Sequence, residues 1–305
     1  MEPIRINDMK LIERAKEVLR ELKQVKNDTG EARLLLGTVL AKNIGVAKSI
    51  KEAEFKVFSQ FGDDGIIQYL LNKIDISVHK FIEFGVENYE ESNTRFLLMH
   101  DNWQGLVIDG SQSNITYIKN DPIYWRYDLT AVDTFVTVEN INHILANNGF
   151  GGKIGILSID IDGNDYWVWQ AITVSQADIV IIEYNSMLGF ERSITVPYKS
   201  DFDCKTAHYS GLYFGASLPA LCDLGNFKGY SFIGCNQAGN NAYFIKSELL
   251  GSLQSLSSEE GFIKSRFRQA RDQSGALTFA NYEERLRELA DLPVINTRTG
   301  LSETI

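Results

Sequence analysis

The chain has 305 residues, 44% of them hydrophobic, which is enough for one large domain or two small ones with a sizeable core. Acidic residues outnumber basic ones by 40 to 30, and the net charge of −10 argues against nucleic-acid or anionic-membrane binding, which needs a basic face. The absence of a ~18-residue apolar run, a signal-peptide core and a C-x-x-C pair predicts a cytoplasmic protein without a membrane span or disulfides.

The first fifty residues are predicted to form a helical extension. Apolar residues, Val18, Leu22 and Val25 among them, recur at helical spacing across residues 8–26. Thr29 is a candidate N-cap for a second helix through residues 31–42. We expect residues 1–50 to serve packing or homo-oligomer formation rather than the functional site.

From residue 55 onward, short apolar runs alternate with helical stretches, which is typical of a parallel sheet covered on both faces. The predicted strands are HKFIEFGV, GLVIDGS, IYWRYDLT, KIGILSIDID and ADIVIIEYN. The runs YSFIGCN and NAYFIKS are separated only by the turn-rich QAGN and predict an antiparallel hairpin. Residues 51–250 are therefore predicted to form a doubly wound, mostly parallel α/β sheet closed by one hairpin. A helical cap is predicted for residues 251–305.

Acidic residues follow the predicted strands, at the edge where open α/β sheets bind their ligands. The residues at these positions are Glu83, Gly85 and Glu87 after the first strand, Asp109, Gly110 and Ser111 after the second, Asp160 and Asp162 after the fourth, and Glu183 and Asn185 after the fifth. Acids gathered at one edge repel one another and require a compensating partner, such as a cationic or hydroxyl-rich ligand or a metal. For Asp165, which opens a predicted helix, a capping role is expected instead.

A nucleotide phosphate is a poor candidate for that partner. The sequence has no G-x-x-x-x-G-K-[ST], and EFGVENYE lacks the G-x-G-x-x-G pattern. A cationic sulfonium ligand with an amino group and ribose hydroxyls fits an acidic edge better. Asp109, after the second strand, could accept both ribose hydroxyl protons in charge-assisted hydrogen bonds. These features favour S-adenosylmethionine as the cofactor.

Three segments carry a resemblance to a known family: SQFGDDGII, FIEFGVENYEESNTRFLL and NWQGLVIDG. They resemble the FkbM-like S-adenosylmethionine-dependent methyltransferases, which typically show S-Q-x-G-[EQ]-D, a strand ending E-x-G, S-N-T and G-W-x-G-L-x-I-[ED]. The resemblance covers about residues 55–250. It implies the seven-stranded methyltransferase fold, a Rossmann-like sheet whose last two strands form the hairpin.

The resemblance also implies roles for individual residues. The residues expected to bind the cofactor are Gln60, Glu83, Gly85, Asn93, Thr94, Asp109, Gly110, Ser111 and Asp160. Where the family usually has a glycine, this chain has Tyr89. Either the backbone near the methionine part of the cofactor differs, or Tyr89 lies beside it, and this departure favours a non-catalytic alternative.

Methyl transfer to a hydroxyl requires an aligned acceptor that loses its proton. In one route the general base is Asp160, Asp162 or His208, since histidine has a convenient unperturbed pKa. In the other, Asp162, Glu183 and Asn185 hold Mg²⁺, which lowers the pKa of the acceptor hydroxyl.

The sequence thus predicts a methyltransferase acting on a hydroxyl of a small molecule or glycan. The sequence is also compatible with two alternatives. One is a non-catalytic scaffold of the same fold, and the other is a different group transfer from the same or a related cofactor, such as aminopropyl transfer.

Overall fold

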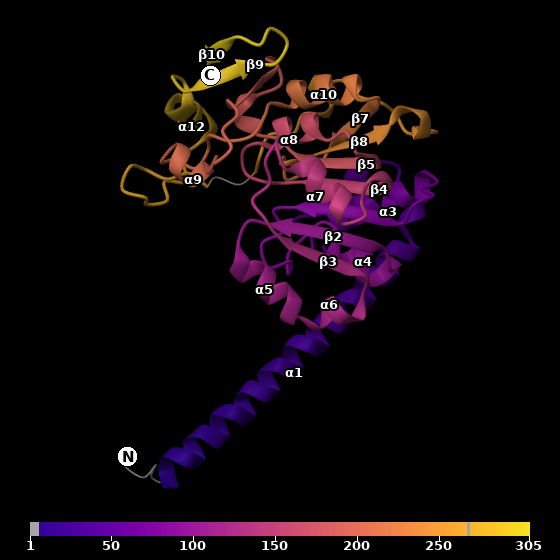
Figure 1. Cartoon of the computed structure of the whole chain (residues 1–305), viewed down its shortest axis with the longest axis vertical. Helices are drawn as coiled ribbons and strands as arrows, with labels where there is room; N and C mark the ends of the chain where they lie inside the picture. The colour runs from indigo at the N-terminus through magenta and orange to yellow at the C-terminus, as the bar shows by residue number, and fades with distance from the viewer. Residues whose placement is uncertain (1–5, 267–268) are drawn as a thin grey trace.

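A computed structural model describes residues 6–266 and 269–305 of the chain, with side chains from residue 13 onward (Figure 1). Seven strands form one sheet in the order β3-β2-β1-β4-β5-β8-β7, and all neighbours are parallel except the pairs made by β8. The strands are β1 Lys80–Phe84, β2 Gln104–Asp109, β3 Leu129–Asp133, β4 Gly152–Ile159, β5 Ser175–Glu183, β7 Tyr230–Cys235 and β8 Asn241–Lys246. The predicted doubly wound sheet with a terminal hairpin is confirmed.

Helices cover both faces of this sheet. Helices α7 (Ile141–Asn147), α8 (Asp165–Ala171) and α10 (Leu218–Phe227) pack on one face, and α3 (Asp63–Lys73), α4 (Arg95–Asp101) and α5 (Gln112–Asn120) pack on the other. Successive residues of a strand point to opposite faces. In β1, Ile82 and Phe84 are buried in the first layer while Phe81 is buried in the second. Continuous apolar runs are therefore what a doubly covered strand requires.

The order of the strands places the functional edge. The chain runs outward from β1 through β2 to β3 and then returns to β4 on the other side of β1. Strand order reverses there, and open α/β sheets bind their ligands at such a point, beyond the carboxyl ends of the strands. The acidic residues that follow the parallel strands all lie along this one edge.

The predicted strand IYWRYDLT is partly wrong. Residues Pro122–Arg126 form helix α6, and β3 begins only at Leu129. Asp121 caps this helix by accepting a hydrogen bond from the Ile123 N–H at 2.8 Å. Proline at the first helical position after an aspartate is a helix-start signal that outweighs the aromatic, strand-like composition.

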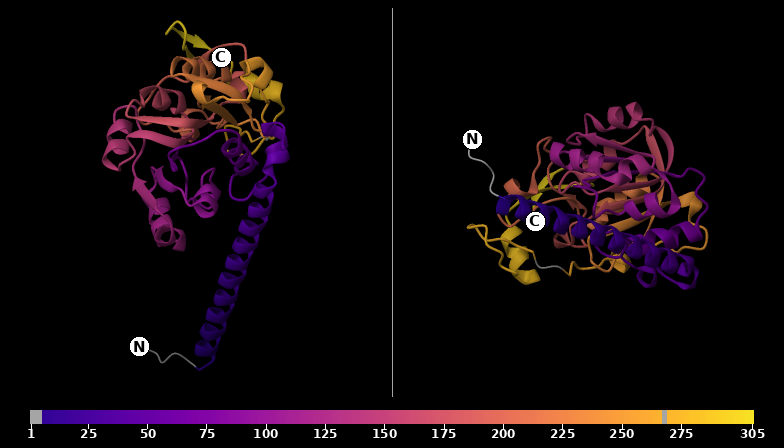
Figure 2. Two further views of the ribbon diagram at one scale, coloured as in Figure 1. Left: turned by 90° about the vertical axis from the view of Figure 1, so that its right-hand side faces the viewer. Right: turned by 90° about the horizontal axis from the view of Figure 1, so that it is seen from below.

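The N-terminal extension is one helix, α1 (Ile6–Lys42), rather than the two predicted. Thr29 lies inside it, where its hydroxyl donates to the Val25 carbonyl at 2.7 Å instead of capping a new helix. Figures 1 and 2 show α1 leaving the rest of the molecule along most of its length. Its last turns contact the body closely, since a Cβ on Gly37 would lie only 2.5 Å from Val57.

The C-terminal region contains more than the predicted helical cap. Helices α11 (Ser258–Gly261) and α12 (Tyr282–Leu289) are followed by strands β9 (Pro293–Asn296) and β10 (Ser302–Thr304). These strands join β6 (Ile194–Thr195) in a second, antiparallel sheet. The remaining short helices are η1 Ile44–Val46, α2 Ile50–Ala53, η2 Ser186–Leu188, α9 Cys204–Ala207 and η3 Ser247–Leu249. Among the described helices, none combines the length and the apolar character that crossing a membrane requires.

Candidate functional site

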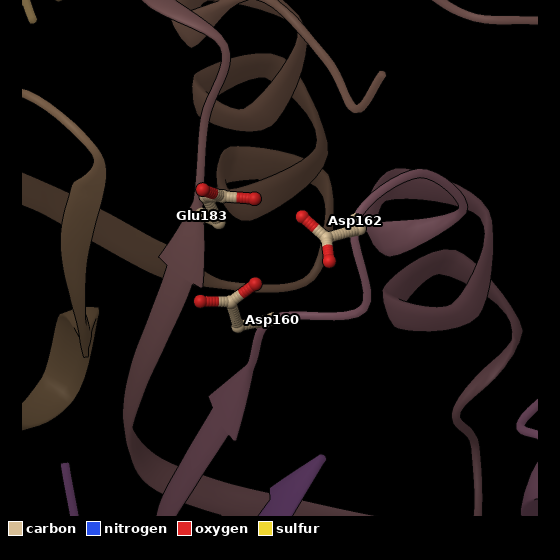
Figure 3. A group of neighbouring side chains, drawn as sticks. All are labelled: Asp160, Asp162 and Glu183. Atoms are coloured by element: carbon tan, nitrogen blue, oxygen red, sulfur yellow. The ribbon is translucent and has the colours of Figure 1, made fainter. Parts of the chain in front are cut away.

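Three carboxylates converge at the carboxyl ends of β4 and β5 (Figure 3). One oxygen each from Asp160, Asp162 and Glu183 lies within 4.8 Å of the other two. The register pairs Ile159 with Ile182, so Asp160 and Glu183 follow side by side at the ends of neighbouring parallel strands. Asp162 reaches them from the loop before α8, with a left-handed backbone at φ 55°. We call these three residues the carboxylate group.

The carboxylate group brings acidic side chains into close contact, and Asp160 and Glu183 are hydrogen-bonded to each other. Burial, reinforced by the neighbouring carboxylates, raises the pKa of both Asp160 and Glu183 well above its ordinary value. Asp162 is the exposed member of the group; desolvation by the surrounding side chains still raises its pKa, while the Lys205 ammonium opposes this shift. Glu183 Oε2 accepts no hydrogen bond from any residue that the structure describes. Such a cluster must hold protons or bind a cation, because fixed negative charges at this separation repel strongly.

Asp165 is separate from this group and has a structural role, although it is not the helix cap that was expected. Its two carboxylate oxygens accept hydrogen bonds from the N–H groups of Ile161 and Gly163, each at 2.9 Å. Burial raises its pKa to about 6 against the effect of these bonds. The bonds run back to the preceding loop rather than forward into α8, so Asp165 fixes the loop that carries Asp162.

Glu83, the acid of β1, is also committed to the fold. It is buried, and its carboxylate accepts hydrogen bonds from the Ser92 hydroxyl at 2.6 Å, the Asn93 N–H at 2.9 Å and both the N–H and hydroxyl of Thr94. The Asn93 amide donates onward to Ser158 Oγ at 3.2 Å. Glu83, Asn93 and Thr94 were expected to line the cofactor, and the structure joins them instead in one buried network beneath the β1 loop.

Gly85 brings the β1 loop against the end of β4. Its φ is +70°, and a Cβ there would lie 1.6 Å from the Asp160 carbonyl oxygen, so no other residue fits without moving the backbone. Tyr89 adopts a similar left-handed backbone at φ 62°, the conformation that glycine favours. Its side chain is fully buried in the core and bonds Thr94 Oγ1 at 3.0 Å. Tyr89 is therefore a core side chain, packed with the apolar residues that cover one face of the sheet.

Asp109, expected to hold the ribose, stands at the end of β2. Its Oδ2 accepts the Glu87 N–H at 2.8 Å, and its Oδ1 accepts the Ser111 N–H at 2.8 Å and the Asn114 amide at 3.0 Å. A carboxylate offers about four acceptor positions, so these three bonds leave room for one further donor. Ser111 caps α5 through Asn114, and Gly110 is exposed beside it.

Three other predicted residues are not brought into the carboxylate group. The Asn185 amide donates to the carbonyls of Leu212 and Phe214 at 2.8 and 3.0 Å, and its oxygen accepts the Met187 N–H. These bonds occupy both the nitrogen and the oxygen of the Asn185 amide. Asn185 was predicted to join Asp162 and Glu183 in a metal site, and Asp160 lies in that position instead.

Gln60 is exposed, and its backbone carbonyl accepts a hydrogen bond from the Lys56 ammonium at 2.8 Å. His208 bonds Ser210 through Nδ1 at 2.8 Å and lies against the Tyr209 ring. Burial lowers the pKa of His208. Within the described residues, no histidine nitrogen belongs to the carboxylate group.

Two features of this edge were missed in the sequence. Lys205, in α9, supplies the positive charge that acts on Asp162. Asp63, at the start of α3, is fully buried, and its Oδ1 accepts hydrogen bonds from Asn236, Asn241 and Tyr243. Asn241 is the cross-strand partner of Glu183, which places this network beside the carboxylate group. The doubled acid in FGDDG was the available signal for Asp63.

A cavity of about 380 Å³ adjoins this network. It lies between the start of α3 and the turn that joins β7 to β8, and Phe61, Gly62, Gln237 and Ala238 line part of it. The edge of the sheet therefore offers a hollow as well as polar groups.

Comparison with known proteins leaves the family open. No protein-family profile and no curated protein matches the sequence. Among solved structures, the N-terminal domain of EvdMO1 with SAH bound is 9% identical, with a TM-score of 0.41 and coverage of 62% of this chain and 80% of that one. A methyltransferase from Clostridium acetobutylicum ATCC 824 is 10% identical, with a TM-score of 0.37 and coverage of 60% and 89%.

The CurJ carbon methyltransferase is also 10% identical, with a TM-score of 0.40 and coverage of 76% of this chain and 70% of that one. Two of these three structural neighbours are named as methyltransferases and the third holds SAH, all at very low identity. Membership of the FkbM-like family accordingly stays a prediction, and the reaction must be argued from the site.

Proposed function

We propose that this chain is an S-adenosylmethionine-dependent methyltransferase that methylates a hydroxyl of a small molecule or glycan. The observation that carries the proposal is the placement of two kinds of acid along one edge of a doubly wound sheet. Asp109 keeps an acceptor position open after β2, and the carboxylate group lies at the carboxyl ends of β4 and β5. Between them, Gly85 lets the β1 loop meet the end of β4 at the reversal of strand order.

The cofactor would lie at the carboxyl ends of β1 and β2, beside the loop that carries Gly85. Asp109 accepts one ribose hydroxyl proton with its remaining acceptor position, and a second only by giving up one of its present bonds. The positive sulfonium is attracted by the nearby negative edge. The Tyr89 side chain is fully buried in the core, so this departure from the family pattern gives no support to the non-catalytic alternative.

The carboxylate group would activate the acceptor. Its donor set consists only of carboxylate oxygens, which is what Mg²⁺ prefers, and Glu183 Oε2 has no hydrogen bond from the described residues to satisfy it. Asp160, Asp162 and Glu183 would hold the ion, which when bound lowers the pKa of an acceptor hydroxyl.

The chain's own residues do the remaining work. Asp165 and Gly163 fix the loop of Asp162, and Asp162, the most exposed of the three, is placed to take the acceptor proton. A phosphate backbone would be repelled by the same charges, which favours an uncharged acceptor such as a sugar or phenol hydroxyl.

Calorimetry with S-adenosylhomocysteine tests the cofactor. Wild type should bind, and Asp109→Ala should bind roughly 10- to 100-fold more weakly, the scale of a hydrogen bond to a charged group. Asp109→Asn, which keeps one acceptor oxygen, is the matched control and should lose less. If the wild type shows no binding at millimolar ligand, the chain is a scaffold and the proposal fails.

Turnover tests the carboxylate group. Asp162→Asn should lower the rate by about 10²- to 10⁴-fold, the range for a positioned proton acceptor, while cofactor affinity stays near wild type. A chelator should lower activity, and Mg²⁺ should restore it. Activity that is indifferent to chelator would assign Asp162 as a metal-independent base, and a product lacking the added methyl mass would exclude methylation.

A further inference from the structure

Helix α1 exposes a long apolar stripe that nothing in the described chain covers. Val18, Leu22, Val25, Leu36 and Val39 have exposed fractions of 48, 60, 61, 66 and 57%. Leu19, Leu35 and Leu40 flank the stripe and are similarly exposed. Large aliphatic side chains grouped on one face of a protruding helix mark an interaction surface, whereas single exposed ones would need no explanation.

The stripe has the spacing of a coiled-coil seam. Its positions, 15, 18, 22, 25, 29, 32, 36 and 39, alternate in steps of three and four, a strict seven-residue repeat. In heptad terms the a positions are Ala15, Leu22, Thr29 and Leu36, and the d positions are Val18, Val25, Ala32 and Val39. A straight helix has 3.6 residues per turn, so a repeat of 3.5 kept over this length favours a left-handed supercoil with another helix.

The body of the molecule occupies the opposite face of α1. Leu34, Gly37 and Ala41 turn toward the domain, where Gly37 is buried and Leu34 and Ala41 pack against the cluster around Val57. At 100° per residue these positions lie about half a turn away from the stripe. A partner helix could therefore cover the stripe without displacing any contact between α1 and the body.

Charges beside the stripe indicate the partner. Glu21 and Asp28 occupy g positions, and Lys26 and Arg33 occupy the e positions five residues after each of them. In a parallel pair of identical helices each g faces the following e of the other chain, so both pairs are attractive. In an antiparallel pair g faces g and e faces e, which sets acid against acid and base against base.

Lys26 and Arg33 lie at the border between the stripe and the body. Lys26 already bonds Glu90 at 2.5 Å, and Arg33 stacks on Phe58 at 4.6 Å from the ring centroid. Surface ion pairs contribute little energy, so these charges set the orientation while the aliphatic seam supplies the affinity.

We propose that α1 forms a parallel coiled coil with the same helix of other copies of this chain. The bodies then lie on the outer faces of the coiled coil, at the same end. Leucine at a with a β-branched residue at d favours more than two strands, and the flanking leucines widen the seam in the same direction. Two copies are the smallest assembly that would cover the stripe, and the seam favours a larger one.

Light scattering during size-exclusion chromatography of the full chain tests the assembly. Between about 1 and 100 µM, a range that covers moderate affinities, the mass should be a multiple of two or more of the 34.4 kDa chain. Leu22→Lys/Leu36→Lys should run as a monomer. Both side chains are exposed in the single chain, so these substitutions should leave its fold intact, which thermal unfolding would verify.

The matched control is Gln24→Lys/Asn27→Lys, which adds the same charge to α1 away from the seam and should leave the mass unchanged. Val18→Cys tests orientation. In a parallel assembly the two introduced thiols face each other and form an interchain disulfide under mild oxidation, while an antiparallel one separates them to opposite ends. A monomeric wild type, an oligomer that survives the double lysine variant, or an oligomer without the disulfide would each overturn the proposal.

Discussion

Glu83 and Asp165 stand at the same edge of the sheet as Asp160 and Glu183, and both pairs are gathered where parallel strands end. The first pair accepts hydrogen bonds from neighbouring N–H and hydroxyl groups, six in all. The second pair lies in mutual contact range, and one oxygen of Glu183 is left without a donor among the described residues. One pair of acids builds the loops, and the other is held in place by them.

The difference in hydrogen-bond donors distinguishes acids that stabilise the fold from acids that are kept for activity. A carboxylate surrounded by donors stabilises the native loop, because each donor would be left unsatisfied without it. A carboxylate facing two others destabilises the native state, and proteins keep such groups where activity requires them. Substitution should therefore have opposite effects on stability in the two pairs, and measuring those effects can confirm or break the distinction.

The largest effect is expected from Glu83→Ala. The hydroxyl of Ser92 and the N–H groups of Asn93 and Thr94 would lose their acceptor in a buried place, so the free energy of unfolding should fall by roughly 3–5 kcal/mol. Urea unfolding measures the loss. Glu83→Gln keeps one acceptor oxygen and should cost less. A cost below about 1 kcal/mol, the ordinary scale of a point substitution, would mean that Glu83 does not hold this turn.

Asp165→Ala should cost less, because two donors rather than four lose their partner. We expect the free energy of unfolding to fall by about 2–3 kcal/mol. Turnover should fall as well, since the loop that positions Asp162 loosens, while affinity for S-adenosylhomocysteine at the β2 side should change little. Asp165→Asn, with one acceptor oxygen retained, should be intermediate in both readouts. Normal turnover in a destabilised Asp165→Ala protein would separate this loop from the chemistry.

Much of this arrangement follows from the sequence. Apolar runs with acids after them predict parallel strands that end at one edge, so the gathering of Asp160, Asp162 and Glu183 could be anticipated. Which acids find donors could not, because this depends on loops in which Glu87, Tyr89 and Asp162 adopt left-handed backbones that their residue types disfavour.

Two other features were beyond the reach of local patterns. The strands β6, β9 and β10 span two to four residues each, and β6 pairs with β9 across about a hundred positions of sequence. Strands that short carry too little alternation to be recognised. Asn185 looked like a metal ligand because it lies two residues after Glu183, but the partners of its amide come from residues 212 and 214. Tertiary contacts decided its role.

The smallest and most diagnostic effect is expected from Glu183→Gln, measured in the presence of a chelator. Burial and its neighbours raise the folded-state pKa of Glu183. When the pKa of an acid is higher in the folded than in the unfolded state, its protonated form favours folding. This contribution to stability is present below the unfolded-state pKa and is lost as pH rises through the folded-state pKa. Glutamine does not ionise, so the Glu183→Gln variant avoids this loss. At pH 8 its free energy of unfolding should therefore exceed that of wild type by about 1 kcal/mol.

At pH 5 the gain from Glu183→Gln should shrink, because the wild-type carboxyl keeps its proton there. The variant should also bind Mg²⁺ more weakly, and added Mg²⁺ should then stabilise wild type more than the variant, since an ion that binds only the folded state raises its stability. A loss of stability at both pH values would place Glu183 with Glu83 and Asp165 among the acids that build the loops. The carboxylate group would then be structural, and the activation of an acceptor would have to come from another part of this edge.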